Sequence, residues 1–341
     1  MDLALLDDRL AARGEPPFRS RQIWEWAARG ADSYEQMTNL PVELRTALAG
    51  EVPFSSLTRV REALARDGTA KALFETADRR AVETVLMRYR DGRRSLCLSS
   101  QSGCPLTCTF CATGRMKFGR NLTASEILDQ ALHFRRTDPV NHAVFMGMGE
   151  PLMNLDNVLA ACERLPELGV ATSNTAISTV GWIPGIERMA REGPPVRLAL
   201  SLHAADDSLR SELMPVNERY PLPDVLAACL RWHESRRRQV FVEYLMLEGV
   251  NDRYEQALEL AAVLEPRRAF KVNLIPWNPI PAQPATPAAS GPSTDPGFRV
   301  SSRDAIAAFR SALEERGVRT TVRLTRGRDI DAACGQLAAR G

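Results

Sequence analysis

Three cysteines that lie within eight residues are the side chains in this sequence best suited to metal chemistry. The stretch "SGCPLTCTFCATG" places Cys104, Cys108 and Cys111 in the spacing CxxxCxxC. An iron–sulfur cluster or a zinc ion bound only by cysteines needs four thiolates, and no fourth cysteine follows within about fifty residues. Three thiolates can hold three irons of a [4Fe-4S] cluster and leave the fourth iron open to a substrate or cofactor. The alternative is a zinc site with a distant fourth ligand.

Small and polar residues end several of the apolar segments that follow. In "FMGMGEP" the glycines allow a ligand to approach the backbone closely, and Glu150 can accept hydrogen bonds from an ammonium group. An amide such as Asn278 suits ribose or adenine contacts. Each of these residues taken alone also fits an ordinary turn or helix cap. The candidate ligand-binding residues are Gly149, Glu150, Ser178, Ser201, Leu202, His203 and Asn278.

The remaining four cysteines divide into two kinds. Cys162 and Cys229 lie in apolar helical contexts, so we expect both in the core. Cys97 lies near the end of an apolar strand segment, just before the three clustered cysteines. Cys334 stands between small residues in "DIDAACGQL", which fits either a buried apolar position or a tip that enters a crowded pocket.

Strand-like and helix-like segments alternate from Ser95 onward. These segments must position the clustered cysteines and the candidate ligand-binding residues. Continuous apolar strands separated by helices indicate a parallel sheet with helices outside it. Six such units predict an α/β fold, an open or partial (β/α)6 barrel with its chemistry at the C-terminal ends of the strands. No GxGxxG pattern supports a doubly wound sheet. The expected strands are 95–100, 142–148, 174–180, 196–202, 240–247 and 270–276, and the expected helices are 123–136, 154–167, 184–192, 221–236 and 253–264.

Four regions are expected along the chain. Residues 1–55 form a helical domain, with helices in "FRSRQIWEWAARG", "SYEQMTNL" and "PVELRTALAG", and residues 56–94 form a small β element. Residues 95–325 form the barrel, including a last helix at 301–316 and a last strand at 319–325. Residues 326–341 form a tail. Within the barrel, residues 278–297 are rich in Pro, Ala, Ser and Gly and predict a mobile surface loop.

Composition and charge indicate the class of protein and its expected location. The 341 residues are 44% hydrophobic and 25% charged, as is typical of a soluble globular protein. No apolar run reaches the ~18 residues of a membrane span, and the acidic N-terminus lacks the basic start of a signal peptide, so we expect a cytoplasmic protein with no membrane contact. The net charge of +2 neither requires nor excludes nucleic acid. The basic stretches "GRMKFGR", "RWHESRRR" and "EPRRAFK" are candidate phosphate contacts.

The cysteine spacing, with Phe110 before the third cysteine, resembles the radical S-adenosylmethionine (SAM) superfamily. The resemblance implies that the open iron binds the amino and carboxylate groups of SAM, and that one electron from the cluster then cleaves SAM to a 5′-deoxyadenosyl radical. In that superfamily a glycine-rich turn contacts the SAM amino group, which assigns this role to Gly149 and Glu150.

Motifs over nearly the whole chain resemble the RlmN/Cfr family of radical SAM RNA methyltransferases. They include "VETVLM", "SLCLSSQSGCPLTCTFCATG", "MGMGEPLMN", "LALSLHA", "NLIPWNP" and "TRGRDIDAACGQLA". The resemblance implies one cluster per chain and two SAM molecules per turnover. One SAM methylates Cys334, the other yields the radical that activates this methyl group for addition to adenine, and Cys97 resolves the adduct, leaving a Cys97–Cys334 disulfide that must be reduced. Glu83 matches the family's proton acceptor, and the N-terminal helices resemble its RNA-docking domain.

Pro151 in "MGMGEPL" favours the RlmN type, because Cfr-type proteins carry Ala there. The expected reaction is therefore methylation of C2 of an adenosine in 23S rRNA, and possibly in tRNA, with flavodoxin or ferredoxin as electron donor to a monomeric enzyme. The alternatives are a Cfr-type C8 methyltransferase, a radical SAM enzyme acting on a small molecule or peptide, and an iron–sulfur redox sensor. Arg328, where RlmN proteins usually carry Asp, is one departure from the family pattern.

Overall fold

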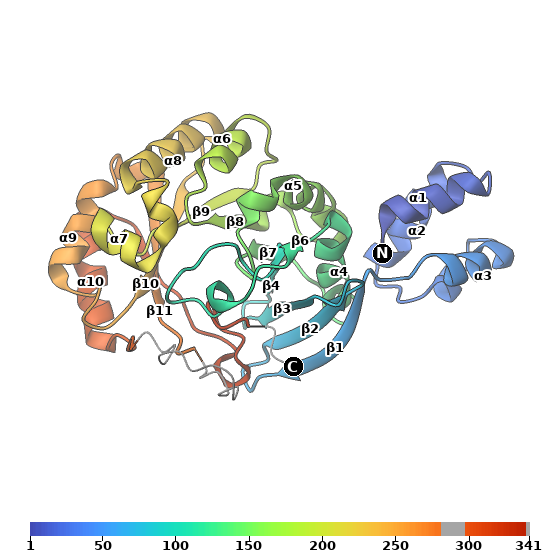
Figure 1. Cartoon of the computed structure of the whole chain (residues 1–341), viewed down its shortest axis with the longest axis horizontal. Helices are drawn as coiled ribbons and strands as arrows, with labels where there is room; N and C mark the ends of the chain where they lie inside the picture. Colours follow the sequence, from blue (N-terminus) through green and yellow to red (C-terminus); the bar gives the residue numbers. More distant parts are fainter. Residues whose placement is uncertain (281–296, 339–341) are drawn as a thin grey trace.

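A single mixed sheet organises the computed structural model, which describes residues 1–280 and 297–338. Its ten strands follow the order β1-β2-β3-β4-β7-β8-β9-β10-β11-β12 (Figure 1). Strands β4 and β7 to β12 run parallel, and β1 to β3 pair antiparallel at the edge beside β4. The strands are β1 (Leu57–Leu64), β2 (Ala70–Thr76), β3 (Ala81–Arg88), β4 (Arg94–Cys97), β7 (His142–Phe145), β8 (Thr175–Thr179), β9 (Arg197–Ser201), β10 (Val240–Met246), β11 (Phe270–Pro276) and β12 (Thr320–Val322).

Helices cover the outer face of the parallel strands and connect them in sequence. They are α4 (Ala124–Arg135), α5 (Leu155–Arg164), α6 (Ile183–Arg191), α7 (Asp207–Leu213), α8 (Leu222–Arg236), α9 (Tyr254–Val263) and α10 (Arg303–Glu315). In Figure 1 they curve around the sheet, whose inner face is left to line a central space. This arrangement is the expected α/β partial barrel, so the fold class is confirmed.

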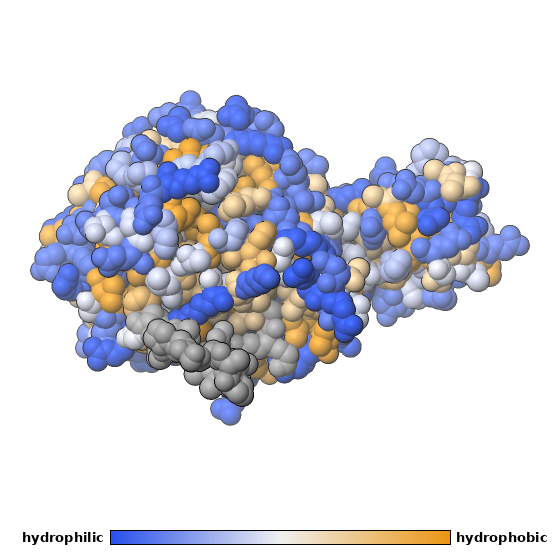
Figure 2. All heavy atoms as spheres, in the orientation of Figure 1, coloured by the Kyte–Doolittle hydropathy of each residue, from blue (hydrophilic) through white to orange (hydrophobic). Residues whose placement is uncertain are grey.

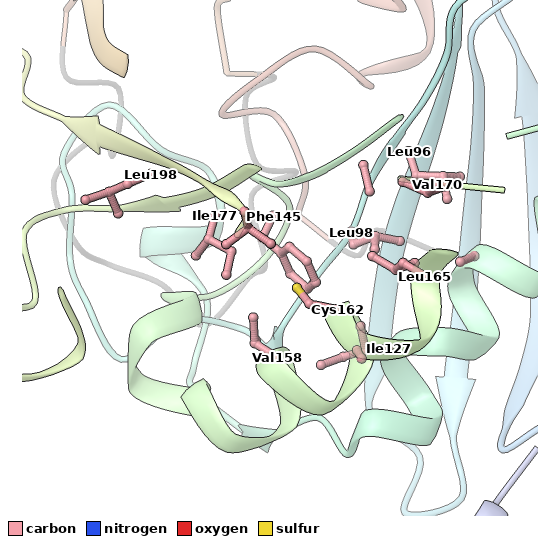
Figure 3. Close-up of a cluster of buried hydrophobic side chains, with 14 of the residues drawn as sticks. Leu96, Leu98, Ile127, Phe145, Val158, Cys162, Leu165, Val170, Ile177 and Leu198 are labelled. Carbon is pink, nitrogen blue, oxygen red and sulfur yellow. The ribbon is translucent and has the colours of Figure 1, made fainter. Parts of the chain in front are cut away.

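The core between sheet and helices is apolar and tightly filled. Figure 3 shows Val158 and Cys162 of α5 packed toward Phe145 of β7 and Ile177 of β8. Cys162 and Cys229 are both fully buried in this cluster, which confirms the expectation that they are core residues. Burial of such side chains stabilises the fold by about 1.5–3 kcal/mol each.

The expected last strand at 319–325 is β12, which pairs parallel with β11 and so follows the six βα units in the same sheet. Other elements differ from the sequence-based expectation. Helix α7 was not predicted, because its seven residues are too few to show a helical period; its start is fixed by Asp206, which caps the backbone N–H of Leu209. The predicted helix in "SYEQMTNL" is only a single 3-10 turn, Tyr34–Gln36.

The N-terminal residues form a separate helical lobe beside the β1 edge of the sheet. It consists of α1 (Leu3–Ala12), α2 (Phe18–Ala28) and α3 (Val42–Glu51), and it projects from the body of the molecule (Figures 1 and 2). Its link to the body includes Trp24, whose indole N–H donates to Glu167 and whose ring lies 4.9 Å from the Arg164 guanidinium. Helix α1 was not expected from the sequence.

Strands β1 to β3 share the sheet of the barrel, so residues 56–94 extend the barrel sheet in this structure. The division into 1–55, 56–94, 95–325 and 326–341 remains a prediction. Most of the predicted loop at 278–297 falls on residues 281–296, which lie outside the described part of the chain. Among the described helices, none is long and apolar enough to cross a membrane.

Candidate active site

The three clustered cysteines lie in one loop whose two ends are tied together. Strands β5 (Gln101–Ser102) and β6 (Arg120–Asn121) form a short antiparallel ladder at the base of this loop, hereafter the cluster loop (residues 103–119). Arg120 anchors the ladder, because its guanidinium lies 2.6 Å from Asp78 and 2.7 Å from Glu126. The loop therefore leaves the C-terminal edge of the sheet as a closed unit.

Two glycines are required by close backbone approach around this loop. A Cβ atom at Gly114 would lie 2.8 Å from the carbonyl oxygen of Cys108. Gly149 has φ +98°, and a Cβ atom there would lie 2.5 Å from the Cβ of Gln101. The glycine-rich turn after β7 is thus pressed directly against the start of the cluster loop.

Cys104, Cys108 and Cys111 line one cavity together with Cys334. Burial raises the pKa of Cys104 to about 12 and that of Cys108 well above its usual value, with the neighbouring thiols adding to the effect. Bound cationic iron would offset the cost of ionising these buried thiols, because cysteine binds metal as the thiolate. Among the described residues, no three His, Cys, Asp or Glu side chains are arranged around a single metal ion. Three thiolates in one cavity can each bind one iron of a [4Fe-4S] cluster.

The opposite wall of this cavity, hereafter the cluster cavity, carries most of the predicted ligand-binding residues. Gly149, Glu150, Ser178, Ser201 and His203 all line it. The Glu150 carboxylate accepts hydrogen bonds from the backbone N–H groups of Leu152 (3.1 Å) and Val180 (3.0 Å). Burial raises the pKa of Glu150 to about 7, although these hydrogen bonds oppose the rise.

His203 is held in one tautomer. Its Nδ1 accepts a hydrogen bond from the backbone N–H of Leu245 at 3.0 Å, which places the proton on Nε2. Burial, and secondarily the charge of Arg210, lowers the pKa of His203 to about 3, so the ring is neutral at physiological pH. Its φ of +60° places it in the left-handed region, and its ring meets Phe110 edge to face at 4.7 Å between centroids. His203 thus offers a fixed N–H donor.

Two predicted ligand-binding residues are placed differently. The Leu202 side chain is fully buried in the main core and does not line the cluster cavity; its backbone bonds to Glu243 and Arg210. Asn278 is buried, and its amide donates to the carbonyl of Cys334 at 3.3 Å while its Oδ1 accepts from Arg328 at 3.4 Å. In this structure Asn278 therefore holds the tail.

The tail crosses from β2 and β3 to the end of β11, beside the cluster loop (Figure 1). The backbone N–H of Ala112 donates to Gly335 at 2.8 Å, and the Thr113 hydroxyl donates to Leu337 at 2.6 Å. These bonds surround Cys334 and direct it into the cluster cavity. Further bonds run from Lys71 to the Asp331 carbonyl (3.1 Å), from Ala338 to the Glu83 carboxylate (2.9 Å) and from Gln336 to the Pro279 carbonyl (2.8 Å).

Cys97 and Cys334 are neighbours in space although they are far apart in sequence. Both are free, partly exposed thiols, and each lies within electrostatic range of Arg323. Burial raises the pKa of Cys97 to about 12, the neighbouring Cys334 adds to this rise, and the Arg323 guanidinium opposes it. A pair of cysteines placed in this way can form a disulfide if the tail moves toward β4.

Glu83 lies beneath the tail rather than in the cluster cavity. It is buried on β3, and Lys71 on β2 lies 3.0 Å from its Oε1. Glu83 is therefore a buried, ion-paired carboxylate rather than a solvated one. The backbone N–H of Ala338 in the tail donates a hydrogen bond to the other carboxylate oxygen of Glu83.

Sequence reasoning missed four charged residues close to the site. They are Lys71, Arg210, Glu243 and Arg323. Glu243 is the only charged residue in the apolar run "VFVEYLML", and an isolated charge in a strand with two covered faces is a usable signal. Arg210 lacks such a signal, because its partners are the side-chain amide of Asn217 and the backbone carbonyls of Leu202, Ser201 and Val180.

The fold and this cysteine site define a class of enzyme. A partial barrel with three cysteines in a loop after its first parallel strand is the arrangement of radical SAM enzymes, and residues 98–261 match the model of the radical SAM superfamily. Residues 1–52 match the N-terminal domain of ribosomal RNA large subunit methyltransferase RlmN. The chain belongs to the RlmN family of radical SAM RNA methyltransferases.

Relatives and a solved structure support this membership over nearly the whole chain. Probable dual-specificity RNA methyltransferases RlmN from Chloroflexus aurantiacus and Gemmatimonas aurantiaca are 43% and 45% identical, over 99% and 98% of this chain and 92% and 90% of theirs. The RlmN of Thermus thermophilus is 42% identical over 99% of this chain and 93% of its own. The crystal structure of a radical SAM methyltransferase from Sphaerobacter thermophilus superimposes with a TM-score of 0.90 at 43% identity, covering 100% of this chain and 98% of that one.

The comparisons confirm the expected family, and with it a [4Fe-4S] cluster and SAM as the cofactors of the superfamily. The protein is therefore a radical SAM RNA methyltransferase. The Cfr-type alternative is not favoured, because these relatives carry the RlmN name.

Proposed function

We propose that the protein methylates C2 of an adenosine in 23S rRNA, and of an adenosine in tRNA, by way of S-methylated Cys334. The observation that carries this proposal is the position of Cys334, which lines the cluster cavity together with Cys104, Cys108 and Cys111. Cys97 adjoins it. A radical SAM enzyme that only cleaved SAM for a small substrate would have no use for this pair of cysteines.

Each residue has a role in the proposed cycle. Cys104, Cys108 and Cys111 hold one [4Fe-4S] cluster per chain, which together with SAM supplies a 5′-deoxyadenosyl radical when bound. Gly149, Glu150, Ser178, Ser201 and His203 bind SAM from the facing wall; Leu202 can contribute only through its backbone. Asn278 contacts the SAM nucleoside once the tail has released its amide.

The tail carries the transferred carbon. The Cys334 sulfur accepts a methyl group from a first SAM, and a second SAM is consumed when a hydrogen atom is taken from that methyl. The Cys334 methylene radical then adds to the adenine carbon, the adduct gives up one electron to the one-electron carrier that serves the enzyme, and Glu83 accepts the proton from that carbon. The Cys97 thiolate attacks the Cys334 sulfur, which forms the disulfide and breaks the bond from that sulfur to the methylene carbon; the carbon takes up a proton and leaves as the methyl group of the RNA. Ala338 must leave the Glu83 carboxylate before Glu83 can act, so the tail shifts during the cycle.

The test is to supply methyl-labelled SAM to reconstituted protein with unmodified 23S rRNA or tRNA, and to digest the RNA to nucleosides. We expect labelled 2-methyladenosine from both RNAs. Label only in 8-methyladenosine would reassign the enzyme to the Cfr-type reaction, and label in rRNA alone would remove the tRNA activity. Absence of any 5′-deoxyadenosine would instead favour the redox-sensor alternative.

The remaining partners are proposed on the family resemblance. A flavodoxin or ferredoxin supplies the single electrons, and the protein acts as a monomer on its RNA. Analytical ultracentrifugation of the reconstituted protein, alone and with RNA, tests the stoichiometry.

A further inference from the structure

A second cavity, hereafter the floor cavity, opens at the N-terminal ends of the parallel strands, on the side opposite the cluster loop. Its volume is about 450 Å³, which is within the range of small-molecule sites. Its lining at this end includes His142, Arg197 and Lys271, which stand at or next to the first residues of β7, β9 and β11. Nothing in the proposed cycle so far uses this space.

The mouth of the floor cavity is positively charged. The Arg197 guanidinium and the Lys271 ammonium each lie 5.7 Å from the ring centre of Phe241, and within residues 1–280 and 297–338 neither forms an ion pair. Arg93 also lines the cavity and pairs only loosely with Asp91, at 3.6 Å. Burial lowers the pKa of His142, and the charges of Arg93 and Arg197 lower it further, as a positive local potential requires. Such a mouth attracts anions and speeds their entry.

The inner end of the floor cavity lies next to the cysteine pair, because Val144, which lines it, pairs with Cys97 across the sheet, and Cys334 lines the adjoining cluster cavity. Met146 and Glu243 line both this cavity and the cluster cavity, so the two spaces meet at these side chains. Arg323 also lines the floor cavity; its Nη1 lies 3.1 Å from the Met146 sulfur and 3.9 Å from Glu243. The same guanidinium interacts electrostatically with Cys97 and Cys334. Arg323 thus places a positive charge at the inner end of the floor cavity, within electrostatic range of both sulfurs.

We propose that the floor cavity admits a small anionic thiol, a low-molecular-mass thiol bearing carboxylates, which reduces the Cys97–Cys334 disulfide at the end of each turnover. This inference rests on the proposed function, because that cycle generates the disulfide. RNA approaches the opposite, cluster-loop side of the barrel, so the reductant and the RNA use separate entrances.

The reduction consists of two exchange steps. The thiolate of the reductant attacks the Cys97 sulfur, the Cys97–Cys334 bond breaks, and Cys334 leaves as a thiolate beside Arg323. A second thiolate attacks the reductant sulfur of the mixed disulfide and releases Cys97 as a thiolate. In sum, two thiols become one disulfide, and the two protein cysteines gain two electrons and two protons.

The test measures repeated turnover of the reconstituted holoenzyme with excess RNA, SAM and a fixed one-electron donor. Three thiols are compared, namely mercaptosuccinate (anionic), 2-mercaptoethanol (neutral) and cysteamine (cationic), each normalised to its rate with a small soluble disulfide, and the thiol-independent rate is subtracted. The Arg197→Gln/Lys271→Gln variant is compared with a matched control, Arg191→Gln/Arg303→Gln, which removes two exposed cations that do not line the floor cavity.

We expect mercaptosuccinate to exceed 2-mercaptoethanol by about tenfold after normalisation, to lose most of this advantage in the floor-cavity variant and at high salt, and to keep it in the control. An equal preference in both variants, or no preference for the anion, would overturn the inference. The first turnover needs no thiol, so a normal burst of methylated RNA keeps the proposed function intact in that case. A missing burst in the unmodified enzyme would contradict the proposed function itself.

Discussion

Cys97 is set apart from the other cysteines by its position at the end of β4, beside a tail that can move. In the proposed cycle its only task is to release RNA from Cys334. We therefore predict that Cys97→Ala protein carries covalently bound RNA after expression. The adduct is measured as nuclease-sensitive mass that survives denaturation. Cys162→Ala is the matched control, because Cys162 is buried in the core and should remain free of RNA. RNA-free Cys97→Ala protein with normal turnover would remove Cys97 from the mechanism.

His203 makes a prediction about stability and pH. Its pKa is about 3 in the folded chain and 6.5 in its ordinary state, so between these values the unfolded chain binds a proton that the folded chain does not. The free energy of unfolding should therefore fall by about 1.4 kcal/mol per pH unit on acidification below about pH 6.5, and stay level above it, as far as this group is concerned. Urea titrations at about pH 5, 6, 7 and 8 measure this slope. In His203→Asn protein the slope below pH 6.5 should be smaller by that amount. Above pH 6.5 the free energy of unfolding should depend on pH in the same way in both proteins. Identical slopes throughout would show that the imidazole is solvated.

At the scale of elements, the cluster loop depends on the ladder of β5 and β6 and on Arg120. The carboxylates of Asp78 and Glu126 both face this guanidinium, and Glu126 is buried. We predict that Arg120→Gln costs about 2 kcal/mol of unfolding free energy, because charge-assisted hydrogen bonds to a buried carboxylate are lost. The reconstituted variant should also lose iron to a chelator faster than the unmodified protein.

Arg80→Gln is the control for this loss. Arg80 lies 3.5 Å from the same Asp78, but it is about half exposed, so its removal should cost less than about 1 kcal/mol and leave iron retention unchanged. Equal effects of the two substitutions would mean that Arg120 acts only as a surface charge.

The alternation of strands and helices could be predicted, because parallel strands that are covered on both faces consist of continuous apolar residues, as in "VRLALSL". The cluster loop could also be predicted, from the CxxxCxxC spacing of its cysteines. The ion pair between Glu243 and Arg323 could not be predicted, although the isolated charge of Glu243 stands out in the sequence, because the pair joins segments that are distant in sequence. The bonds of Asn278 and Glu83 to the tail were hidden for the same reason: they join segments at least 50 residues apart.

At the scale of the whole molecule, the basic stretches sort onto opposite ends of the barrel. "GRMKFGR" belongs to the cluster loop and β6, whereas "RWHESRRR" and "EPRRAFK" precede β10 and enter β11 at the floor. Only the first stretch faces the side where the proposed target base must enter. The helical lobe projects beyond the sheet edge (Figure 1), where it can extend the RNA contact.

Lys117 is an exposed residue of the cluster loop. We predict that Lys117→Gln weakens RNA binding and reduces the slope of log Kd against log salt concentration by the amount that one phosphate contact contributes, about one. Arg268→Gln, an exposed residue of the floor side, should leave both quantities unchanged. Binding is measured by fluorescence anisotropy at several salt concentrations. A larger effect of Arg268→Gln would place the RNA on the floor side, and the reductant would then need another entrance.

The tail has a consequence for how the substrate is admitted. The partial barrel is open between its two edge strands, and the tail bonds to both sides of that opening: to the β1–β2 turn through Asp67 and Arg66, and to the residues after β11 through Asn278 and Pro279. In the proposed cycle, the sulfur that receives the methyl group is thus carried by part of the barrel wall. A displacement that draws Cys334 away from the cluster loop would also open the side of the barrel. On this proposal, methyl delivery and entry of the target base are coupled, and we expect the RNA to displace the tail before its base can enter.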